Sequence, residues 1–380
     1  MSNTKIIPFN KPYLTGKETI YIEDAAKRGK LSGDGFYTKK CQTFFEEKYG
    51  FKKVFLTTSC TDALEMIALL LDIQSGDEII IPSYTFVSTA NAFILRGATI
   101  RFTDSKIEHP GMDEDKLEAL ITAKTKAIVV VHYAGIACNM DKIIALAEKY
   151  SLYIIEDAAQ AIDGFYNGRA LGSIGHFAAF SFHETKNIIS GEGGMLVVNS
   201  ERFIERAEII REKGTNRNKF FRGEVDKYNW VDIGSSFLPS EITAAFLYAQ
   251  LEQMDAIQQK RLSLWNTYYR ELLPLKDIGI IIPEIPVFAS NNAHAFYLIC
   301  KDEQQRDALI RKLKAENILA VFHYLSLHNS PYFREKHDNR KLENSETFSD
   351  CLVRLPLYFE LTEEDITSII VPLVKSFFNV

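Results

Sequence analysis

The sequence has few cysteines, no long apolar run and no surplus of positive charge. Its 380 residues include five cysteines at wide, irregular spacing without a C-x-x-C pair. We therefore expect reduced thiols in a cytoplasmic protein, and no metal site is predicted. No apolar run approaches the about 18 residues of a membrane-spanning helix, and the first residues lack the apolar stretch of a signal peptide. We expect neither membrane insertion nor export.

Two further absences argue against particular classes of function. Forty-four Lys and Arg face fifty Asp and Glu, for a net charge of −6. Without a basic surplus, the composition does not support binding to a nucleic acid backbone. The first predicted strand is followed by Thr-Thr-Ser-Cys-Thr at 57–61 rather than by G-x-G-x-x-G, which argues against a nicotinamide-dependent sugar epimerase. The remaining classes are soluble globular proteins, mostly enzymes acting on small molecules.

From residue 54 onward, short β-branched runs alternate with helical patterns. This alternation is typical of strand–helix–strand units around a mostly parallel sheet. Several runs are apolar throughout, so we expect helices on both faces and a three-layer α/β core. The predicted strands are 54–57, 78–82, 99–103, 127–132, 152–157, 178–182 and 195–199, and the predicted helices are 61–72, 83–96, 113–122, 139–150 and 202–213.

The pattern changes after residue 199. A long helix is predicted over 241–272, and Pro274, Pro283 and Pro286 interrupt the following stretch. Strands near 295–301 and 318–322, a helix at 303–316 and a terminal helix after Thr362 then predict a smaller α+β domain. We place the large domain at 1–255 and the small C-terminal domain at 256–380.

Two charged residues follow neighbouring predicted strands, where ligands of parallel α/β sheets gather. Asp157 ends the strand at 152–157, and Lys186 lies four residues beyond the strand at 178–182, before the glycine-rich run 191–194. Taken singly, each has a plainer explanation. A lone Asp at a strand end more often caps the next helix, and most lysines are solvated.

Together with a third element the two residues indicate pyridoxal phosphate (PLP). This cofactor needs a lysine for its aldehyde, an acid for its ring nitrogen and a helix N-terminus for its phosphate. The third element is the segment 57–64, where a strand ends in hydroxyl residues and a helix begins. In the segment 84–86, an aromatic residue at a strand end is available to stack on the ring, although such residues more often belong to the core.

The same residues resemble the DegT/DnrJ/StrS family of sugar aminotransferases over essentially the whole chain. The motifs are Ser59-x-Thr61-x-Ala63-Leu64, Glu156-Asp-Ala-Ala-Gln160 and Ser181-x-His183-x-x-Lys186 with its glycine run. Further stretches are similar to the WecE (RffA) type, the dTDP-4-amino-4,6-dideoxygalactose transaminases. They are 33–35, 82–91, 131–135, 181–186 and 211–217.

The resemblance implies the fold of the PLP-dependent transferases of fold type I, which is like that of aspartate aminotransferase, and a set of site residues. Lys186 would bind the cofactor covalently and Asp157 would pair with its ring nitrogen. Gln160 would contact the ring hydroxyl, Phe86 would stack on the ring, and the phosphate would be held by Ser59, Cys60, Thr61 and Ser181. Candidate substrate residues are His183, His323, Tyr324 and His328. Cys60 departs from many relatives, which have Gly there, and Leu238 stands where many have an Asn that reaches the partner's phosphate.

The implied reaction is ping-pong transamination in a homodimer with its sites at the interface. The amino group of L-glutamate would pass to dTDP-4-keto-6-deoxy-D-glucose, giving dTDP-4-amino-4,6-dideoxy-D-galactose for a cell-surface polysaccharide such as an O-antigen. The gluco epimer and a 3-amino sugar stay open. Lys186 argues against a related PLP-dependent dehydratase, which has His there, and a non-catalytic PLP-binding regulator is the alternative from another class.

Overall fold

The core of the larger lobe is a seven-stranded sheet. The computed structural model describes residues 5–380, and its strand order is β1-β9-β8-β5-β4-β2-β3. From β8 to β3 the strands are parallel, whereas β9 is antiparallel to both of its neighbours. All seven predicted strands are present, at β1 (Val54–Thr57), β2 (Glu78–Pro82), β3 (Thr99–Thr103), β4 (Thr125–Val131), β5 (Tyr153–Asp157), β8 (Phe177–Ser181) and β9 (Gly194–Val198).

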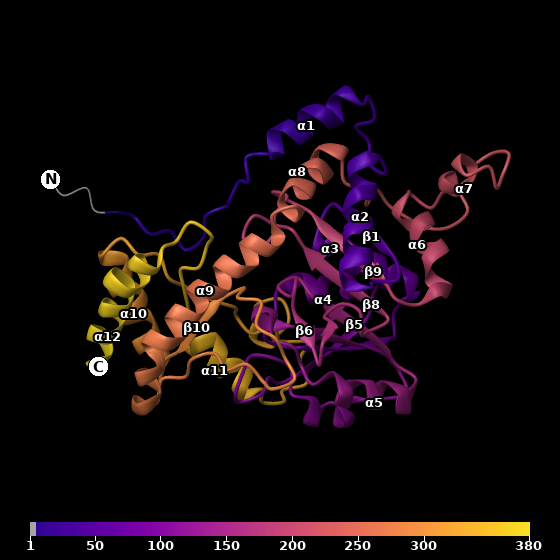
Figure 1. Cartoon of the computed structure of the whole chain (residues 1–380). Helices are drawn as coiled ribbons and strands as arrows, with labels where there is room; N and C mark the ends of the chain where they lie inside the picture. Colours follow the sequence, from indigo (N-terminus) through magenta and orange to yellow (C-terminus); the bar gives the residue numbers. More distant parts are fainter. Residues whose placement is uncertain (1–4) are drawn as a thin grey trace.

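Helices cover both faces of this sheet, as Figure 1 shows. Along β4, Ile128 and Val130 pack into the core on one face and Ala127 and Val129 into the core on the other. This two-sided burial explains why the strand is apolar throughout. One face carries α2 (Phe36–Tyr49), α5 (Met140–Tyr150) and α8 (Glu241–Leu251), and the other carries α3 (Cys60–Leu70), α4 (Val87–Ile94) and α6 (Ile204–Arg211).

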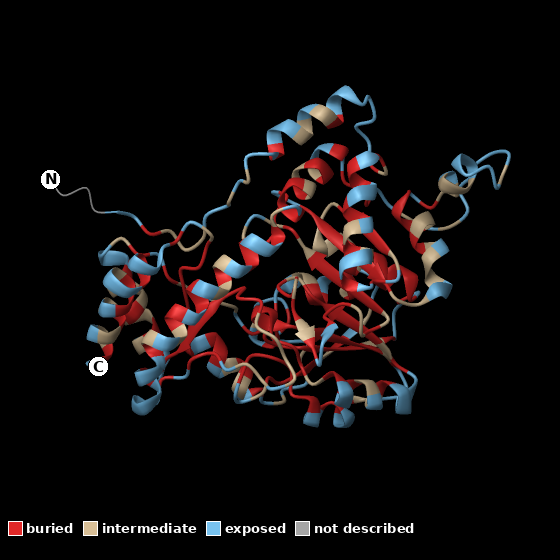
Figure 2. Ribbon diagram, viewed as in Figure 1, coloured by how far each residue is buried: buried red, intermediate tan, exposed pale blue. Residues whose placement is uncertain are grey.

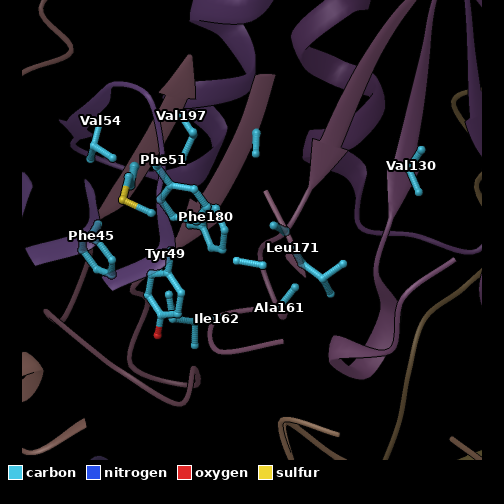
Figure 3. Packing of buried hydrophobic residues seen from close by; sticks show 14 of the residues in the cluster. Phe45, Tyr49, Phe51, Val54, Val130, Ala161, Ile162, Leu171, Phe180 and Val197 are labelled. Atoms are coloured by element: carbon cyan, nitrogen blue, oxygen red, sulfur yellow. The ribbon is translucent and has the colours of Figure 1, made fainter. Parts of the chain in front are cut away.

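Aromatic rings fill the space between α2 and the sheet. Phe45 stacks on Phe182 with ring centroids 5.5 Å apart, and Phe51 lies 5.6 Å from Phe180. Figure 3 shows this cluster, with Tyr49 beside Phe45. Large buried side chains of this kind hold the strand ends around β8 in place, because cores tolerate little change in volume.

Two helical expectations need correction, and three helices were not expected. The predicted helix at 113–122 is two short 3₁₀ turns, η1 (Glu114–Lys116) and η2 (Glu118–Leu120). The predicted helix at 241–272 is two helices, α8 and α9 (Met254–Leu272), because α8 packs on α1 and α2 whereas α9 is part of the small lobe's core. Helices α1 (Glu18–Lys27), α2 and α7 (Arg217–Phe221) were not anticipated.

The smaller lobe is built on a three-stranded antiparallel sheet in the order β10-β12-β11. Its elements are β10 (Phe296–Ile299), α10 (Glu303–Ala315), β11 (Val321–Phe322), α11 (Glu343–Cys351), β12 (Leu352–Leu355), the π-helical turn Asp365–Ile370 and α12 (Val371–Phe378). Chain segments cross between the lobes. Ile7 pairs with Ile318 in the small lobe's core, and Leu327 and Phe333 pack into the large lobe. The division at residue 255 stays a prediction.

The remaining elements are short. They are the hairpin β6 (Phe165–Tyr166) and β7 (Arg169–Ala170) and the 3₁₀ turns Tyr133–Gly135, Glu201–Phe203, Leu273–Ile278 and Leu327–Asn329. Figure 2 shows the sheet as buried and the arm around α7 as largely exposed. Within residues 5–380, no helix combines the length and the apolar character that crossing a membrane requires.

Candidate active site

A cavity of about 390 Å³ lies where the carboxyl ends of β5 and β8 face the small lobe. This size is in the usual range for a cofactor or small-molecule site. Every cofactor residue expected from the sequence lines it, and so do residues from the small lobe. The lining includes Ser59, Cys60, Thr61, Phe86, Thr89, Asp157, Gln160, Ser181, His183, Lys186, Glu192, His294, His323, Tyr324 and Arg354.

Asp157 ends β5 as a buried carboxylate held in one orientation. Thr89 Oγ1 donates to its Oδ2 at 2.7 Å, and the backbone N–H of Ala159 donates to Oδ1 at 3.2 Å. Burial raises the pKa of Asp157, and these two hydrogen bonds and the charge of Lys186 oppose that rise. A carboxylate in this setting is stabilised by a cationic partner, which a protonated ring nitrogen would supply.

The preceding residue, Glu156, has a structural role on the opposite face of β5. It accepts hydrogen bonds from the backbone N–H groups of Gly172, Ile174 and Gly175, and it lies 3.0 Å from His132 Nε2. Side chains of successive strand residues point to opposite faces, so only one of the two acids can reach the cavity.

Lys186 lies on the loop between β8 and β9, and this loop is closed by backbone hydrogen bonds. The Phe182 N–H donates to the Gly193 carbonyl at 2.8 Å, and the Ser190 N–H donates to the Phe182 carbonyl at 2.7 Å. The next residue, Asn187, is buried and donates to Gln258 Oε1 at 2.9 Å and to the Asn292 carbonyl at 2.8 Å. These contacts hold the backbone at Lys186 in place, while its side chain lines the cavity.

Burial lowers the pKa of the Lys186 amine to about 8, with a further lowering from the charge of Arg354. At pH 7 about one such amine in ten is neutral, against about one in 3,000 for an ordinary lysine. Only the neutral amine attacks an aldehyde. Lys186 therefore fits the role of the cofactor's covalent anchor.

This pKa predicts how fast the apoprotein captures PLP at different pH values. Below pH 8 the rate should rise about tenfold per pH unit, and above pH 8 it should level off, because the amine is then already neutral. Mixing apoprotein with PLP while following the visible absorbance measures the rate, and N-acetyl-lysine serves as the control whose rate keeps rising. A protein rate still rising tenfold between pH 9 and 10 would contradict the shift.

The N-terminus of α3 forms one end of the cavity. Ser59 is the N-cap and accepts from the Asp62 N–H at 3.0 Å, while Thr61 Oγ1 donates to Ser88 Oγ at 2.8 Å in the first turn of α4. Gly194 at the start of β9 permits this turn, since an added Cβ would lie 2.2 Å from Ser59 C. Free N–H groups in the first turn and nearby hydroxyls make an anion site.

The ring-binding candidates lie around Tyr324. Gln160 Oε1 accepts from the Ala134 N–H at 2.7 Å, and its Nε2 donates to Tyr324 Oη at 3.1 Å. The Phe86 ring is 54% exposed and its centroid lies 5.9 Å from that of Tyr324. An apolar ring this exposed at the cavity is consistent with stacking on a ligand, and the roles of Gln160 and Phe86 stay predictions.

Of the three candidate substrate histidines, two line the cavity. His183 Nδ1 lies 2.9 Å from Thr185 Oγ1, and His323 Nδ1 lies 3.0 Å from Tyr133 Oη. His328 is not among the residues that line it, and its role as a substrate contact stays a prediction. It is buried between Ser83 Oγ, at 2.6 Å, and Glu346 Oε1, at 3.1 Å, and so joins the loop after β2 to α11.

Three further residues line the cavity but were not predicted from the sequence, namely Thr89, His294 and Arg354. Thr89 lies one helical turn after Phe86, and this spacing places both at the same end of α4. His294 and Arg354 come from the small lobe, far from Lys186 in the chain, and they carry no local signal. His294 Nδ1 lies 2.9 Å from Asn187 Oδ1, and burial, reinforced by Lys186 and Arg354, lowers the pKa of His294 well below its usual value.

A second and larger cavity of about 660 Å³ lies on the large lobe, and it shares no lining residue with the cavity around Lys186. Basic side chains dominate its wall, with Lys30, Lys39, Lys53, Arg211, Lys213, Arg217 and Arg222 against Asp34, Glu208 and Glu212. Leu238 also lines it. Apolar side chains nearby are unusually exposed, and Trp230 reaches 82%. Such a surface is typical of a contact with another chain.

The donor set of the first cavity fits PLP. An anchored lysine with a lowered pKa, a buried carboxylate and a helix N-terminus meet at strand ends of a mostly parallel sheet, which defines a PLP-dependent transferase of fold type I. The chain belongs to the DegT/DnrJ/EryC1/StrS aminotransferase family, whose model matches residues 12–374. It is therefore a PLP-dependent sugar aminotransferase of this family.

Known relatives match along nearly the full chain. An uncharacterized protein of Methanocaldococcus jannaschii is 30% identical over 378 residues, covering 97% of both chains. S. venezuelae DesV has a TM-score of 0.90 at 27% identity and covers 98% of this chain and 99% of its own. A putative sugar aminotransferase of Streptococcus pneumoniae, solved in a PLP form and a PMP form, shares the fold with a TM-score of 0.89 at 24% identity over 99% of both chains.

Proposed function

We propose that the protein transfers the amino group of L-glutamate to dTDP-4-keto-6-deoxy-D-glucose and so makes dTDP-4-amino-4,6-dideoxy-D-galactose. The convergence of Lys186, Asp157 and the α3 N-terminus in one cavity carries the transamination. The particular sugar is supported by the sequence motifs shared with the WecE type, above all the stretches 82–91 and 181–186. The product would serve a cell-surface polysaccharide and be made in the cytoplasm.

When bound, PLP supplies the electron sink and carries the amino group between donor and acceptor. The protein's own side chains and backbone would bind the cofactor and move the protons. Asp157 would hold a proton on the ring nitrogen. The Cys60 and Thr61 N–H groups and the hydroxyls of Ser59 and Ser181 bind the phosphate. Lys186 Nζ takes a proton from the reacting carbon of one substrate and returns one to the other, which its lowered pKa permits near neutral pH.

The sugar is proposed to lie against the residues that face Lys186 across the cavity. His183 is on its open side, with its Nε2 3.7 Å from Glu192 Oε1. His323 and Tyr324 come from the small lobe, and burial lowers the pKa of His323, so it stays neutral and can accept or donate a hydrogen bond. These three are the substrate contacts we assign.

We also propose that the working unit is a homodimer in which the basic cavity of one subunit faces the PLP cavity of the other. Among residues 5–380, Lys186 and Arg354 are the only Lys or Arg side chains that line the cavity around Lys186, too few for a sugar nucleotide with its pyrophosphate. The seven basic residues of the second cavity and the exposed apolar side chains beside it would supply both the charge and the contact. Light scattering should then give twice the mass of one chain.

The product of the reaction tests the proposal directly. Purified protein is incubated with PLP, L-glutamate and dTDP-4-keto-6-deoxyglucose, and the amino sugar is analysed by NMR. A small vicinal H3–H4 coupling, from an axial amine, supports the galacto product, whereas a large one indicates the gluco epimer. An amine at C3 would instead identify the protein as a 3-amino-sugar transaminase. If the protein is fully loaded with cofactor but turns over no keto sugar, the alternative of a non-catalytic PLP-binding regulator would be favoured.

A further inference from the structure

Tyr133 is a buried tyrosine whose hydroxyl reaches a residue of the PLP cavity although its own side chain does not line that cavity. It lies in the turn Tyr133–Gly135, just after the carboxyl end of β4, and is only 2% exposed. Its Oη lies 3.0 Å from Nδ1 of His323, which does line the cavity. Burial raises the pKa of Tyr133 to about 12, so the hydroxyl keeps its proton near neutral pH. This buried proton needs an acceptor.

Aromatic packing holds the Tyr133 ring in one place. Its centroid lies 5.4 Å from that of Tyr84, 6.0 Å from that of Tyr297 and 6.2 Å from that of Tyr324. A ring that is packed on several sides cannot swing away without disturbing its neighbours. The hydroxyl of Tyr133 therefore has a fixed direction, toward His323.

The hydrogen bond to Tyr133 decides which nitrogen of His323 carries a proton. Burial, with smaller contributions from the charges of Arg354 and Lys186, lowers the pKa of His323, so its ring is neutral and has one N–H. If Nδ1 accepts the hydroxyl proton of Tyr133, that N–H is at Nε2. In the described part of the chain, residues 5–380, the His323 side chain makes no other hydrogen bond. Its Nε2 is therefore free for a ligand in the cavity.

We propose that Tyr133 is a positioning residue that holds His323 with its proton on Nε2, so that this N–H donates to an oxygen of the keto sugar. The inference rests on the proposed function, in which His323 contacts the sugar. A neutral N–H donor suits the uncharged carbonyl and hydroxyl oxygens of a sugar, whereas the carboxylates of an amino acid are matched better by charged donors. Tyr133 thereby acts in the half-reaction with the sugar and not in that with L-glutamate.

The tautomer of His323 can be measured without any substrate. The PLP-loaded protein is labelled with 15N-histidine, and NMR distinguishes the two ring nitrogens because the protonated one has the lower 15N shift. The signals are assigned by their loss in His323→Gln. We expect the proton on Nε2 in the wild type and a mixture of both tautomers in Tyr133→Phe. Tyr297→Phe is the matched control and should keep the wild-type pattern, because the buried Tyr297 hydroxyl has no hydrogen-bond partner within residues 5–380.

The two half-reactions show where this hydrogen bond matters. The amino form of the enzyme is mixed with dTDP-4-keto-6-deoxyglucose in a single turnover, and the absorbance of the cofactor is followed. In Tyr133→Phe the second-order rate constant should fall about fivefold, because His323 loses both its fixed orientation and its single tautomer. The reaction of the PLP form with L-glutamate should change less than about twofold. Tyr297→Phe should leave both rate constants within twofold.

A double substitution separates this role of Tyr133 from simple packing. The amide of Gln offers an N–H donor at its Nε2, as the proposed tautomer of His323 does, and an amide has no second tautomer. In a His323→Gln background, Tyr133→Phe should therefore cost less than about twofold in the sugar half-reaction. If the Tyr133 hydroxyl acted only through packing, the fivefold cost would persist in that background.

Four results would overturn the proposal. They are a proton on Nδ1 of His323 in the wild type, an unchanged sugar half-reaction in Tyr133→Phe, an equal loss in both half-reactions, and a fivefold cost that persists in His323→Gln. The wild-type spectrum decides the first of these even if Tyr133→Phe fails to fold. Failure of the proposed function looks different, because the wild-type amino form would then react with no keto sugar while the spectrum, recorded without sugar, would be unaffected.

Discussion

Replacing Lys186 with Ala is expected to abolish turnover, with a loss of at least about 10⁴-fold. By the proposed mechanism, the variant lacks both the covalent anchor of the cofactor and the base that moves the proton. The loop should keep its shape, because Asn187 and the backbone bonds between Phe182 and Gly193 hold it without the lysine side chain. Product formation measures the loss, and circular dichroism checks the fold.

A covalent readout makes this test specific for Lys186. Borohydride reduction of the loaded protein should fix the cofactor on the peptide that contains Lys186, as seen by mass spectrometry, and Lys186→Ala should carry no such label. Lys142→Ala is a suitable control. Lys142 pairs with Asp115 on the surface, away from the cavity, and its loss should change neither activity nor labelling. An active Lys186→Ala protein, or a label on another lysine, would refute the assignment.

Asp157→Asn is expected to lose about 10²–10³-fold in turnover while still binding the cofactor. Asn has nearly the same shape and can accept the hydrogen bond from the Ala159 N–H, but it cannot hold the ring nitrogen protonated. A neutral ring accepts electrons from the reacting carbon poorly. The variant should therefore show a shifted cofactor absorbance and a low rate. Full turnover in Asp157→Asn would remove Asp157 from the mechanism.

The neighbouring acid provides the matched control for Asp157. Like Asp157→Asn, Glu156→Gln replaces a carboxylate at the end of β5 with an amide. The Glu156 side chain, however, lies on the face of the strand away from the cavity. Glu156 accepts three backbone N–H groups and pairs with His132, and its pKa is lowered through the hydrogen bond from His132 in spite of its burial. Its loss should destabilise the protein by about 1–3 kcal/mol, seen as a lower Tm. Activity per folded molecule should be nearly unchanged.

Much of the large lobe and of the cofactor site could be predicted from the sequence because both depend on short segments. An apolar run such as 127–131 predicts a strand that is covered on both faces, and β4 is such a strand. Parallel strands end at a common edge, so a residue at the end of one strand lies near a residue at the end of the next. This rule placed Asp157 and Lys186 near each other, and the groups that PLP requires then pointed to the segment 57–64 that contains Ser59.

Helix breaks and helices outside the repeating pattern could not be predicted in the same way. The stretch 241–272 keeps helical character throughout, yet it divides at Glu252 and Gln253 because its halves pack on different lobes. The 113–122 stretch has the apolar spacing of a helix but forms only two 3₁₀ turns. In both cases the tertiary contacts, and not the local periodicity, select the conformation.

The identity of the cavity's remaining residues is decided by tertiary structure. Both His323 and His328 follow β11 within a few residues, and the sequence does not distinguish them. In the fold one lines the cavity, and the other joins Ser83 to Glu346. No local sequence pattern marks Arg354 as a residue of the cavity either. It lies 168 positions after Lys186 on a strand of the other lobe, and only the packing of the two lobes places its charge beside the lysine.

The sequence by itself therefore predicted the cofactor, since the residues proposed to bind PLP lie at the ends of strands and in short local motifs. The tertiary structure decided which side chains of the small lobe complete the cavity, and it separated the basic residues into a second cavity on the large lobe. The physical reason is that contacts between lobes depend on the packing of whole surfaces, which no short stretch of sequence encodes.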